Sequence, residues 1–287
     1  MASAGELRNL LAEAAQALRQ AGVESAALDA ELLLAAAAGV DRARLLSGSV
    51  RLDSKPVRRF QRMVARRAAR EPLAYILGHK EFYGLDFEVS RDVLIPRPET
   101  ELVVETALEV LHQQPDARVL DLGTGSGAIA IALAVNAPAA RIAAVDICSA
   151  ALQLARRNAR RHGCEARIEF FLGDLFAALP CSHQKYDLIV SNPPYVREDE
   201  MAALQPELAR YEPHLALIGG QDGLDFFRRI AAGTASHLNT GGEVIVELGA
   251  GQEADVVRIM QAAGLHIVQL LRDLAGHHRV LHARLPG

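Results

Sequence analysis

Short apolar segments alternate with helical patterns from residue 101 onward, and this alternation constrains the fold more than any other feature. The segments contain many β-branched residues and lie at 118–122, 141–146, 167–172, 186–191, 243–248, 265–271 and 279–284. Strands separated by helices pair mainly in parallel, because each helix carries the chain back to the start of the next strand. We therefore predict an α/β fold: a doubly wound, seven-stranded, Rossmann-like sheet with helices on both faces.

Residues 1–75 show helical patterns and no strand pattern. One helix face is marked by apolar residues three and four positions apart: Leu7, Leu10, Leu11, Ala14 and Leu18. Two more helices are predicted at 27–38 and 56–70, where Pro56 suits a first helical turn. We expect residues 1–77 to form a helical bundle domain.

A different pattern separates the bundle from the α/β region. Residues 80–89 alternate loosely around Gly84, which predicts a β-hairpin. Two prolines stiffen the segment 95–100 that follows, and Thr100 is placed to cap the next helix. We expect 78–98 to be a hairpin linker and 99–287 to be the α/β domain.

Net charge argues against general binding of nucleic acid. The whole chain carries −4, although residues 1–98 carry +3 and residues 99–287 carry −7. The longest apolar run, 32–40, is too short to cross a bilayer, and the N-terminus lacks a signal-peptide pattern. We expect a cytoplasmic monomer with no membrane association and no stable nucleic-acid partner.

The three cysteines are Cys148, Cys164 and Cys181, and none has CxxC spacing. An odd and sparse set argues against a disulfide framework and against a zinc site. We expect a reducing compartment, cysteines that serve as core residues, and no bound metal.

A glycine-rich turn, 121–127, follows the first strand of the α/β region and reads Asp-Leu-Gly-Thr-Gly-Ser-Gly. Glycines allow a sharp turn and close approach of a ligand, and the next helix presents free N–H groups. Asp146 ends the second strand, where a carboxylate can accept hydrogen bonds from both ribose hydroxyls. The turn therefore predicts a cofactor that contains a nucleoside.

Two classes of cofactor fit this turn. Gly123, Gly125 and Ala128 satisfy the dinucleotide pattern G-x-G-x-x-A, so NAD stays open. Asp121 would disfavour a pyrophosphate but suits the cationic methionine end of S-adenosyl-L-methionine. Asp174, after the third strand, could accept a hydrogen bond from an adenine amino group. The two carboxylates favour S-adenosyl-L-methionine.

Asn-Pro-Pro-Tyr, 192–195, directly follows the fourth strand, at the sheet edge that also holds the glycine-rich turn. An amide nitrogen is a poor nucleophile because its lone pair is delocalised into the carbonyl. The Asn192 side-chain oxygen and the Pro193 carbonyl can accept its two N–H groups and direct it at a sulfonium methyl. Tyr195 can stack on the planar group. The motif predicts N-methyl transfer to a planar amide or amine.

Three segments together resemble HemK-type (PrmC-type) release-factor glutamine methyltransferases: 95–101, 121–127 and 191–195. The resemblance covers nearly the whole chain and includes the helical domain and the hairpin. It implies an S-adenosyl-L-methionine-dependent methyltransferase domain at 99–287. It also implies, as substrate, the glutamine in the Gly-Gly-Gln motif of class I peptide chain release factors, methylated at its side-chain amide.

The resemblance and the residue chemistry together assign the site. The expected catalytic residues are Asn192, Pro193 and Tyr195. The expected cofactor contacts are Asp121, Gly123, Thr124, Gly125, Ser126, Gly127, Asp146, Asp174, Leu175 and Asn192. The expected substrate contacts are Asn192, Pro193, Pro194, Tyr195 and Arg97. A linker salt bridge is the alternative role for Arg97. Some members carry an aromatic residue where this chain has Leu175, so Phe176 is the other candidate for the adenine contact.

Other functions stay open from the sequence. Adenine and guanine N-methyltransferases share Asn-Pro-Pro-Tyr, so an exocyclic amine of a nucleic-acid base is an alternative substrate. The acidic balance of 99–287 argues against it. A binding protein without catalysis and an NAD-dependent dehydrogenase are further alternatives. The Arg-rich stretch 56–70 is either a solvated helix face or a docking surface for an acidic protein or RNA.

Overall fold

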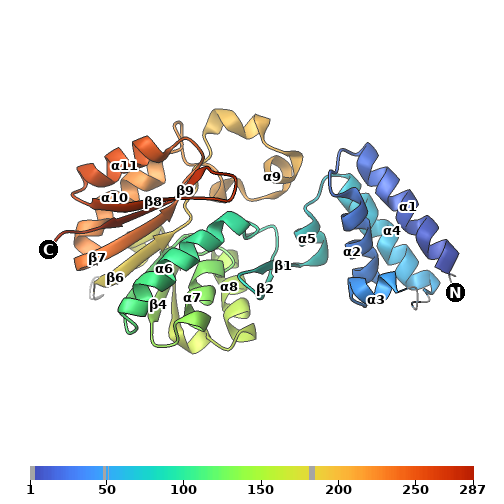
Figure 1. Ribbon diagram of the computed structural model, residues 1–287, viewed down its shortest axis with the longest axis horizontal. Coiled ribbons are helices and arrows are strands. Elements are labelled where there is room, and N and C mark those ends of the chain that lie inside the picture. The colour runs from blue at the N-terminus through green and yellow to red at the C-terminus, as the bar shows by residue number, and fades with distance from the viewer. Residues whose placement is uncertain (1–3, 48–49, 51, 181–184) are drawn as a thin grey trace. The chain divides into compact units, whose positions relative to one another are not determined.

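A computed structural model describes residues 4–47, 50, 52–180 and 185–287 (Figure 1). The chain divides into two compact units. The helical unit comprises Met1–Gly78 together with Gln205–Tyr211, and the α/β unit comprises His79–Leu204 together with Glu212–Gly287. Within the described part of the chain, no helix is both long enough and apolar enough to cross a membrane.

The helical unit is the predicted bundle. Its helices are α1 (Ala4–Gln20), α2 (Ala26–Ala38), α3 (Arg42–Leu46), α4 (Ser54–Ala68), α5 (Leu73–Leu77) and α9 (Pro206–Tyr211). Leu18, Leu33, Leu34 and Phe60 lie at the centre of its apolar core. The short helices α3 and α5 were not predicted, because five residues show too little periodicity.

The Arg-rich helix α4 is only partly a solvated face. Arg58, Arg59 and Arg62 are exposed, but Arg67 is buried. The Arg67 guanidinium donates to Asp29 at 2.7 Å and to Glu207 at 2.8 Å, and Arg70 binds the Glu207 carboxylate through two nitrogens at 2.7 and 2.6 Å. These bonds attach α9 to α4 and explain why a segment so distant in the sequence belongs to the helical unit.

Replacing Arg67 with alanine should destabilise the helical unit strongly. The change leaves the buried Asp29 with the Ser25 hydroxyl as a donor but without its cationic partner, and removal of one member of a buried ion pair costs about 3–5 kcal/mol. Urea denaturation followed by far-ultraviolet circular dichroism measures the effect. Arg62→Ala on the exposed face of α4 is the matched control, and equal stability of the two variants would contradict the structural role of Arg67.

The α/β unit contains the predicted seven-stranded sheet. Its strands are β3 (Arg118–Leu122), β4 (Arg141–Asp146), β5 (Ile168–Leu172), β6 (Tyr186–Ser191), β7 (Leu238–Glu247), β8 (His266–Arg272) and β9 (His278–Arg284), in the order β5-β4-β3-β6-β7-β9-β8. The five strands β3 to β7 pair in parallel, and β9 runs antiparallel between β7 and β8. The strand order reverses at β3 and β6, where a doubly wound sheet opens a crevice for ligands.

Helices cover both faces of this sheet, as predicted (Figure 1). On one face lie α6 (Glu101–Gln113), α7 (Ala128–Asn136) and α8 (Ser149–Arg161), and on the other lie α10 (Asp225–His237) and α11 (Glu253–Ala262). Short 3₁₀ helices are η1 (Pro98–Thr100), η2 (Glu165–Arg167), η3 (Leu175–Ala178), η4 (Glu198–Ala203) and η5 (His214–Ala216). Both faces are apolar because parallel strands are buried on each side.

The predicted hairpin forms from β1 (His79–Phe82) and β2 (Leu85–Glu88). Its turn residues Tyr83 and Gly84 have φ of 52° and 72°, the positive values that a tight two-residue hairpin turn requires. The Asn158 side chain on α8 accepts from the Glu88 N–H at 2.8 Å and donates to the Glu88 carbonyl at 3.0 Å. The hairpin is therefore packed as part of the α/β unit.

Candidate active site

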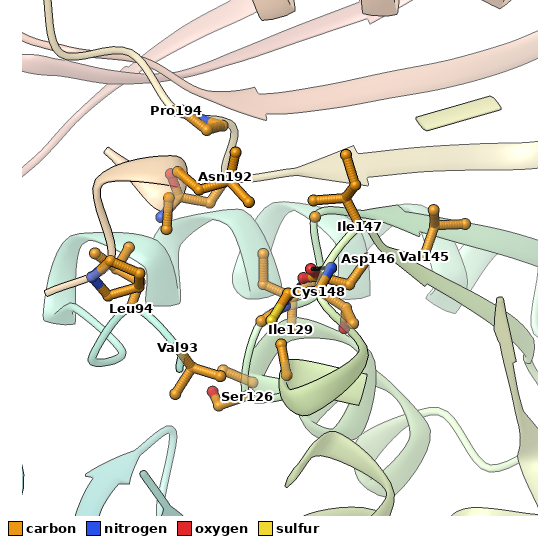
Figure 2. Close-up of a pocket in the computed structure, with 18 of the residues that line it drawn as sticks. Val93, Leu94, Ser126, Ile129, Val145, Asp146, Ile147, Cys148, Asn192 and Pro194 are labelled. Carbon is orange, nitrogen blue, oxygen red and sulfur yellow. Dashed lines mark hydrogen bonds between the residues drawn. The ribbon is translucent and has the colours of Figure 1, made fainter. Parts of the chain in front are cut away.

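A cavity of about 280 Å³ lies within the α/β unit at the C-terminal ends of β3, β4 and β6, where the strand order reverses. Figure 2 shows Asn192 and Pro194 across this cavity from Asp146 and Cys148, with Val93 and Leu94 on another side. Its size is close to the lower end of the range for small-molecule sites, roughly 300–1,000 Å³. The glycine-rich turn and the Asn-Pro-Pro-Tyr loop therefore border one space.

Most of the predicted site residues border the cavity. They are Arg97, Gly123, Thr124, Gly125, Ser126, Asp146, Asp174, Leu175, Asn192 and Pro194. The remaining predicted residues, Asp121, Gly127, Pro193 and Tyr195, are not among the described residues that line it. Gly127 instead permits close packing at the start of α7, since a Cβ there would stand 2.8 Å from Ile131 Cδ1.

Asp121 lies beneath the glycine-rich turn and has no exposed surface. The Thr124 hydroxyl donates to its Oδ2 at 2.7 Å, whereas Oδ1 has no hydrogen-bond partner among the residues the structure describes. Burial raises the pKa of this carboxyl to about 7. Asp121 thus holds Thr124 in place and does not itself line the cavity.

Asp146 borders the cavity at the end of β4. Its Oδ2 accepts from the Gly125 N–H and its Oδ1 from the Cys148 N–H, each at 2.8 Å. Burial raises the pKa of this carboxyl. Each carboxylate oxygen has a second lone pair, so both can still accept from a pair of ribose hydroxyls.

After β5, the third strand of the α/β region, Leu175 rather than Phe176 borders the cavity. Leu175 is buried, borders the cavity and has a φ of 49°. The Phe176 ring stacks on His237 of α10, with ring centroids 4.4 Å apart. Asp174 also borders the cavity, where it forms a 2.7 Å ion pair with Arg229. A planar base in this part of the cavity would contact Leu175.

A hydrogen bond to Thr100 fixes the Asn192 side chain. Its Nδ2 donates to the Thr100 hydroxyl at 3.0 Å. Thr100 stands at the N-cap of α6, but its side chain makes no cap hydrogen bond, so the predicted capping role was wrong. The hydroxyl instead donates to Glu247 at the end of β7, at 2.6 Å.

Tyr195 binds the other oxygen of the Glu247 carboxylate. Its hydroxyl donates to Glu247 at 3.2 Å, and burial raises the pKa of the Tyr195 phenol. Its backbone carbonyl accepts from Gln252 at 3.0 Å. Tyr195 is therefore fixed at both its ring hydroxyl and its backbone, which makes the Asn-Pro-Pro-Tyr loop rigid.

Gly219 packs directly against this loop. A Cβ at this position would lie 2.7 Å from the Pro194 carbonyl oxygen and 2.8 Å from Tyr195 Cα. The neighbouring backbone is also paired, because Val196 N–H donates to Leu217 and Gly219 N–H donates to Val196, each at 2.8 Å. The segment 217–219 thus sets the position of the loop.

We expect Gly219→Ala to lower kcat at least about tenfold. The added methyl displaces Pro194 and with it the adjoining Pro193 carbonyl, and misplacement of a catalytic group by about 1 Å can cost roughly 10²-fold. The affinity for the cofactor should change little. Steady-state kinetics and calorimetry of the same preparation measure both quantities. A variant with wild-type kcat would show that the loop tolerates this displacement.

Arg97 forms the ion pair that was its alternative role, and it also borders the cavity. Its guanidinium pairs with the buried Glu212. Glu212 also accepts from the Ile95 N–H at 3.2 Å. The stiff segment 95–100 is thereby fixed beside the cavity.

Sequence reasoning missed several residues of the site. Apolar walls come from Val93, Leu94, Ile147 and Phe226, which carry no motif. Cys148 was expected in the core but borders the cavity, whereas Cys164 is buried and Cys181 lies outside the described residues. The described residues contain no cluster of His, Cys, Asp and Glu that could hold a metal ion.

Two domain families match the chain, the PrmC N-terminal domain over residues 9–78 and the methyltransferase small domain over residues 100–211. A release factor glutamine methyltransferase of Cereibacter sphaeroides is 48% identical over 94% of this chain and 95% of its own length. The enzyme of the same name from Geobacter sulfurreducens is 47% identical over 93% of each chain. The chain belongs to the release factor glutamine methyltransferase family. The family assignment agrees with the two units, because its N-terminal domain ends where the helical unit's first segment ends.

Solved structures support the fold. A methyltransferase from Pyrococcus furiosus superposes with a TM-score of 0.53 at 18% identity, over 79% of this chain and 98% of that one. The hMettl16 catalytic domain, solved in complex with the MAT2A 3′UTR hairpin 6, gives 0.59 at 16% identity, over 78% and 82%. At these identities the likeness concerns the fold alone.

Proposed function

We propose that this protein transfers a methyl group from S-adenosyl-L-methionine to the side-chain amide nitrogen of the glutamine in the Gly-Gly-Gln motif of class I peptide chain release factors. The observation that carries the proposal is the single cavity shared by the glycine-rich turn, Asp146 and Asn192. Family membership supports the substrate, since relatives 47–48% identical over most of their length are named for it.

The residues around the cavity fit this cofactor. Asp146 keeps two acceptor lone pairs for a ribose, and Ile147 and Leu175 provide apolar surface for a purine. Asp174 would accept from the adenine amino group if it exchanged part of its contact with Arg229. When bound, S-adenosyl-L-methionine supplies an electrophilic methyl on a positively charged sulfur.

The Asn-Pro-Pro-Tyr loop would hold the glutamine amide. The Asn192 Oδ1 would accept one N–H and the Pro193 carbonyl the other, which orients the nitrogen lone pair. As the nitrogen gains positive character, both acceptors stabilise it more strongly. The amide proton then leaves to water, so the site needs no strongly basic side chain.

We further propose that residues 1–77 recognise the release factor and that 78–98 connect this domain to the methyltransferase domain, 99–287. We expect a cytoplasmic monomer without a stable nucleic-acid partner. The exposed arginines of α4, Arg58, Arg59 and Arg62, are available for contacts with an acidic protein surface.

Mass spectrometry tests this function directly. The purified protein is incubated with S-adenosyl-L-methionine and a class I release factor, and the Gly-Gly-Gln peptide is analysed. One added methyl on the glutamine side chain is expected, and a release factor with the glutamine replaced by alanine should gain none. Methylation of RNA under the same conditions, with none on the release factor, would favour the nucleic-acid alternative.

A further inference from the structure

A buried carboxylate stands behind the catalytic loop and takes no direct part in the proposed reaction. Glu247 is 1% exposed at the end of β7, and Thr100 is 4% exposed between it and Asn192. The bonds form one chain, from Asn192 Nδ2 to the Thr100 hydroxyl at 3.0 Å and from that hydroxyl to Glu247 Oε2 at 2.6 Å. These two hydrogen bonds connect the Asn192 side chain, which would hold the reacting amide, to the Glu247 carboxylate.

The direction of these bonds follows from the number of hydrogens. A threonine hydroxyl has one hydrogen, and an ionised carboxylate only accepts. Thr100 therefore gives its hydrogen to Glu247 and can only accept from Asn192. The Asn192 NH₂ group must then face Thr100, which leaves the side-chain oxygen free on the other side.

The second oxygen of Glu247 is also engaged. Tyr195 donates its hydroxyl to Oε1 at 3.2 Å, so one carboxylate holds both ends of the Asn-Pro-Pro-Tyr loop. The positive charge of Arg279 on β9 favours the ionised form of Glu247, and the negative charge of Glu99 opposes it. Arg279 itself donates to Asp273 at 2.9 Å.

We propose that Glu247 is a positioning residue that acts through Thr100 to fix which end of the Asn192 amide meets the substrate. With Glu247 ionised, the Asn192 oxygen faces the glutamine N–H, as methyl transfer requires. A flipped Asn192 would present NH₂ to the substrate NH₂ and repel it. The inference rests on the proposed function, because it concerns the same acceptor.

The arrangement predicts a dependence of kcat on pH. Burial raises the pKa of Glu247 to about 7, although the hydrogen bonds from Thr100 and Tyr195 oppose the rise. Below that pH the protonated carboxyl can donate to Thr100, whose hydrogen then becomes available to the Asn192 oxygen. Activity should therefore fall as pH falls through about 7.

Two substitutions test the chain of bonds. Glu247→Gln keeps the shape but lets the side chain donate to Thr100, and Thr100→Val removes the hydroxyl at nearly constant volume. Each should lower kcat at least about tenfold with little change in cofactor affinity. Glu247→Gln should also lose the fall of kcat at low pH. Thr100→Ser, which keeps the hydroxyl, should recover most of the activity that Thr100→Val loses.

A substrate-free measurement separates this inference from the proposed function. The Asn192 side-chain NH₂ should exchange its hydrogens with solvent more slowly in the wild type than in Thr100→Val, as followed by NMR. Failure of the wild type to methylate a release factor would overturn the proposed function alone. Equal exchange rates in the two proteins, or wild-type kcat and pH profile in a folded Glu247→Gln, would overturn the positioning role. Should Glu247→Gln not fold, the comparison of Thr100→Val with Thr100→Ser decides the question.

Discussion

Asn192→Ala is expected to lower kcat by about 10²- to 10³-fold, the usual effect of removing one preorganised group that stabilises developing charge. The variant loses the side-chain oxygen that would accept the substrate N–H, while the Pro193 carbonyl remains. One acceptor then holds the amide, and the nitrogen can rotate away from the methyl group. Single-turnover methylation of a release factor measures the chemical step.

Cofactor affinity separates this role from others. Asn192 contributes one side of the cavity, whereas the turn at 123–126 and Asp146 form another part of it. The dissociation constant for S-adenosyl-L-methionine, measured by calorimetry, should therefore stay within a few-fold of the wild type. Asn136→Ala, on the exposed end of α7, is the matched control and should leave both quantities unchanged. Simultaneous loss of turnover and cofactor binding in Asn192→Ala would assign Asn192 to cofactor binding only.

The sheet could be predicted from the sequence because its signals are local. Most strands are short apolar runs that follow or precede a helix, and 118–122, 141–146 and 186–191 agree with β3, β4 and β6 at both ends. The β7 strand begins at Leu238, earlier than the predicted 243. The prediction missed this start because the first part of the strand is polar and glycine-rich. A parallel strand is recognised by apolar character, and that part of β7 lacks it.

The site could be predicted only where a motif marks it. The glycine-rich turn, Asp146 and Asn192 carry recognisable chemistry at strand ends, so their presence in one cavity followed from the topology. The Thr100–Glu247 bond joins residues 147 positions apart, and Glu207 reaches Arg67 across 140. The periodicity of apolar residues in helices and strands does not predict such pairs, because each pair depends on how separate elements pack. Thr100 was assigned a local role as a helix cap, and the tertiary contact replaced it.

Asp146→Ala is expected to weaken binding of S-adenosyl-L-methionine by about 10²-fold or more, since hydrogen bonds to a charged group contribute roughly 1.5–3 kcal/mol each. Two effects add. The ribose would lose an acceptor for each of its hydroxyls, and the Gly125 and Cys148 N–H groups would lose the oxygens that now orient them. The backbone that approaches the cofactor would therefore loosen as the direct contact disappears.

Asp146→Asn tests the second effect, the loss of the oxygens that orient the Gly125 and Cys148 N–H groups. Its amide keeps one acceptor oxygen but turns an NH₂ group toward either the Gly125 or the Cys148 N–H, which repels it. We expect it to bind the cofactor no better than Asp146→Ala, because the turn is disturbed as well as the ribose contact. Asp116→Ala, an exposed carboxylate outside the cavity, is the control for loss of negative charge. A folded Asp146→Ala that bound S-adenosyl-L-methionine with the wild-type dissociation constant in a calorimetric titration would show that Asp146 does not contact the cofactor.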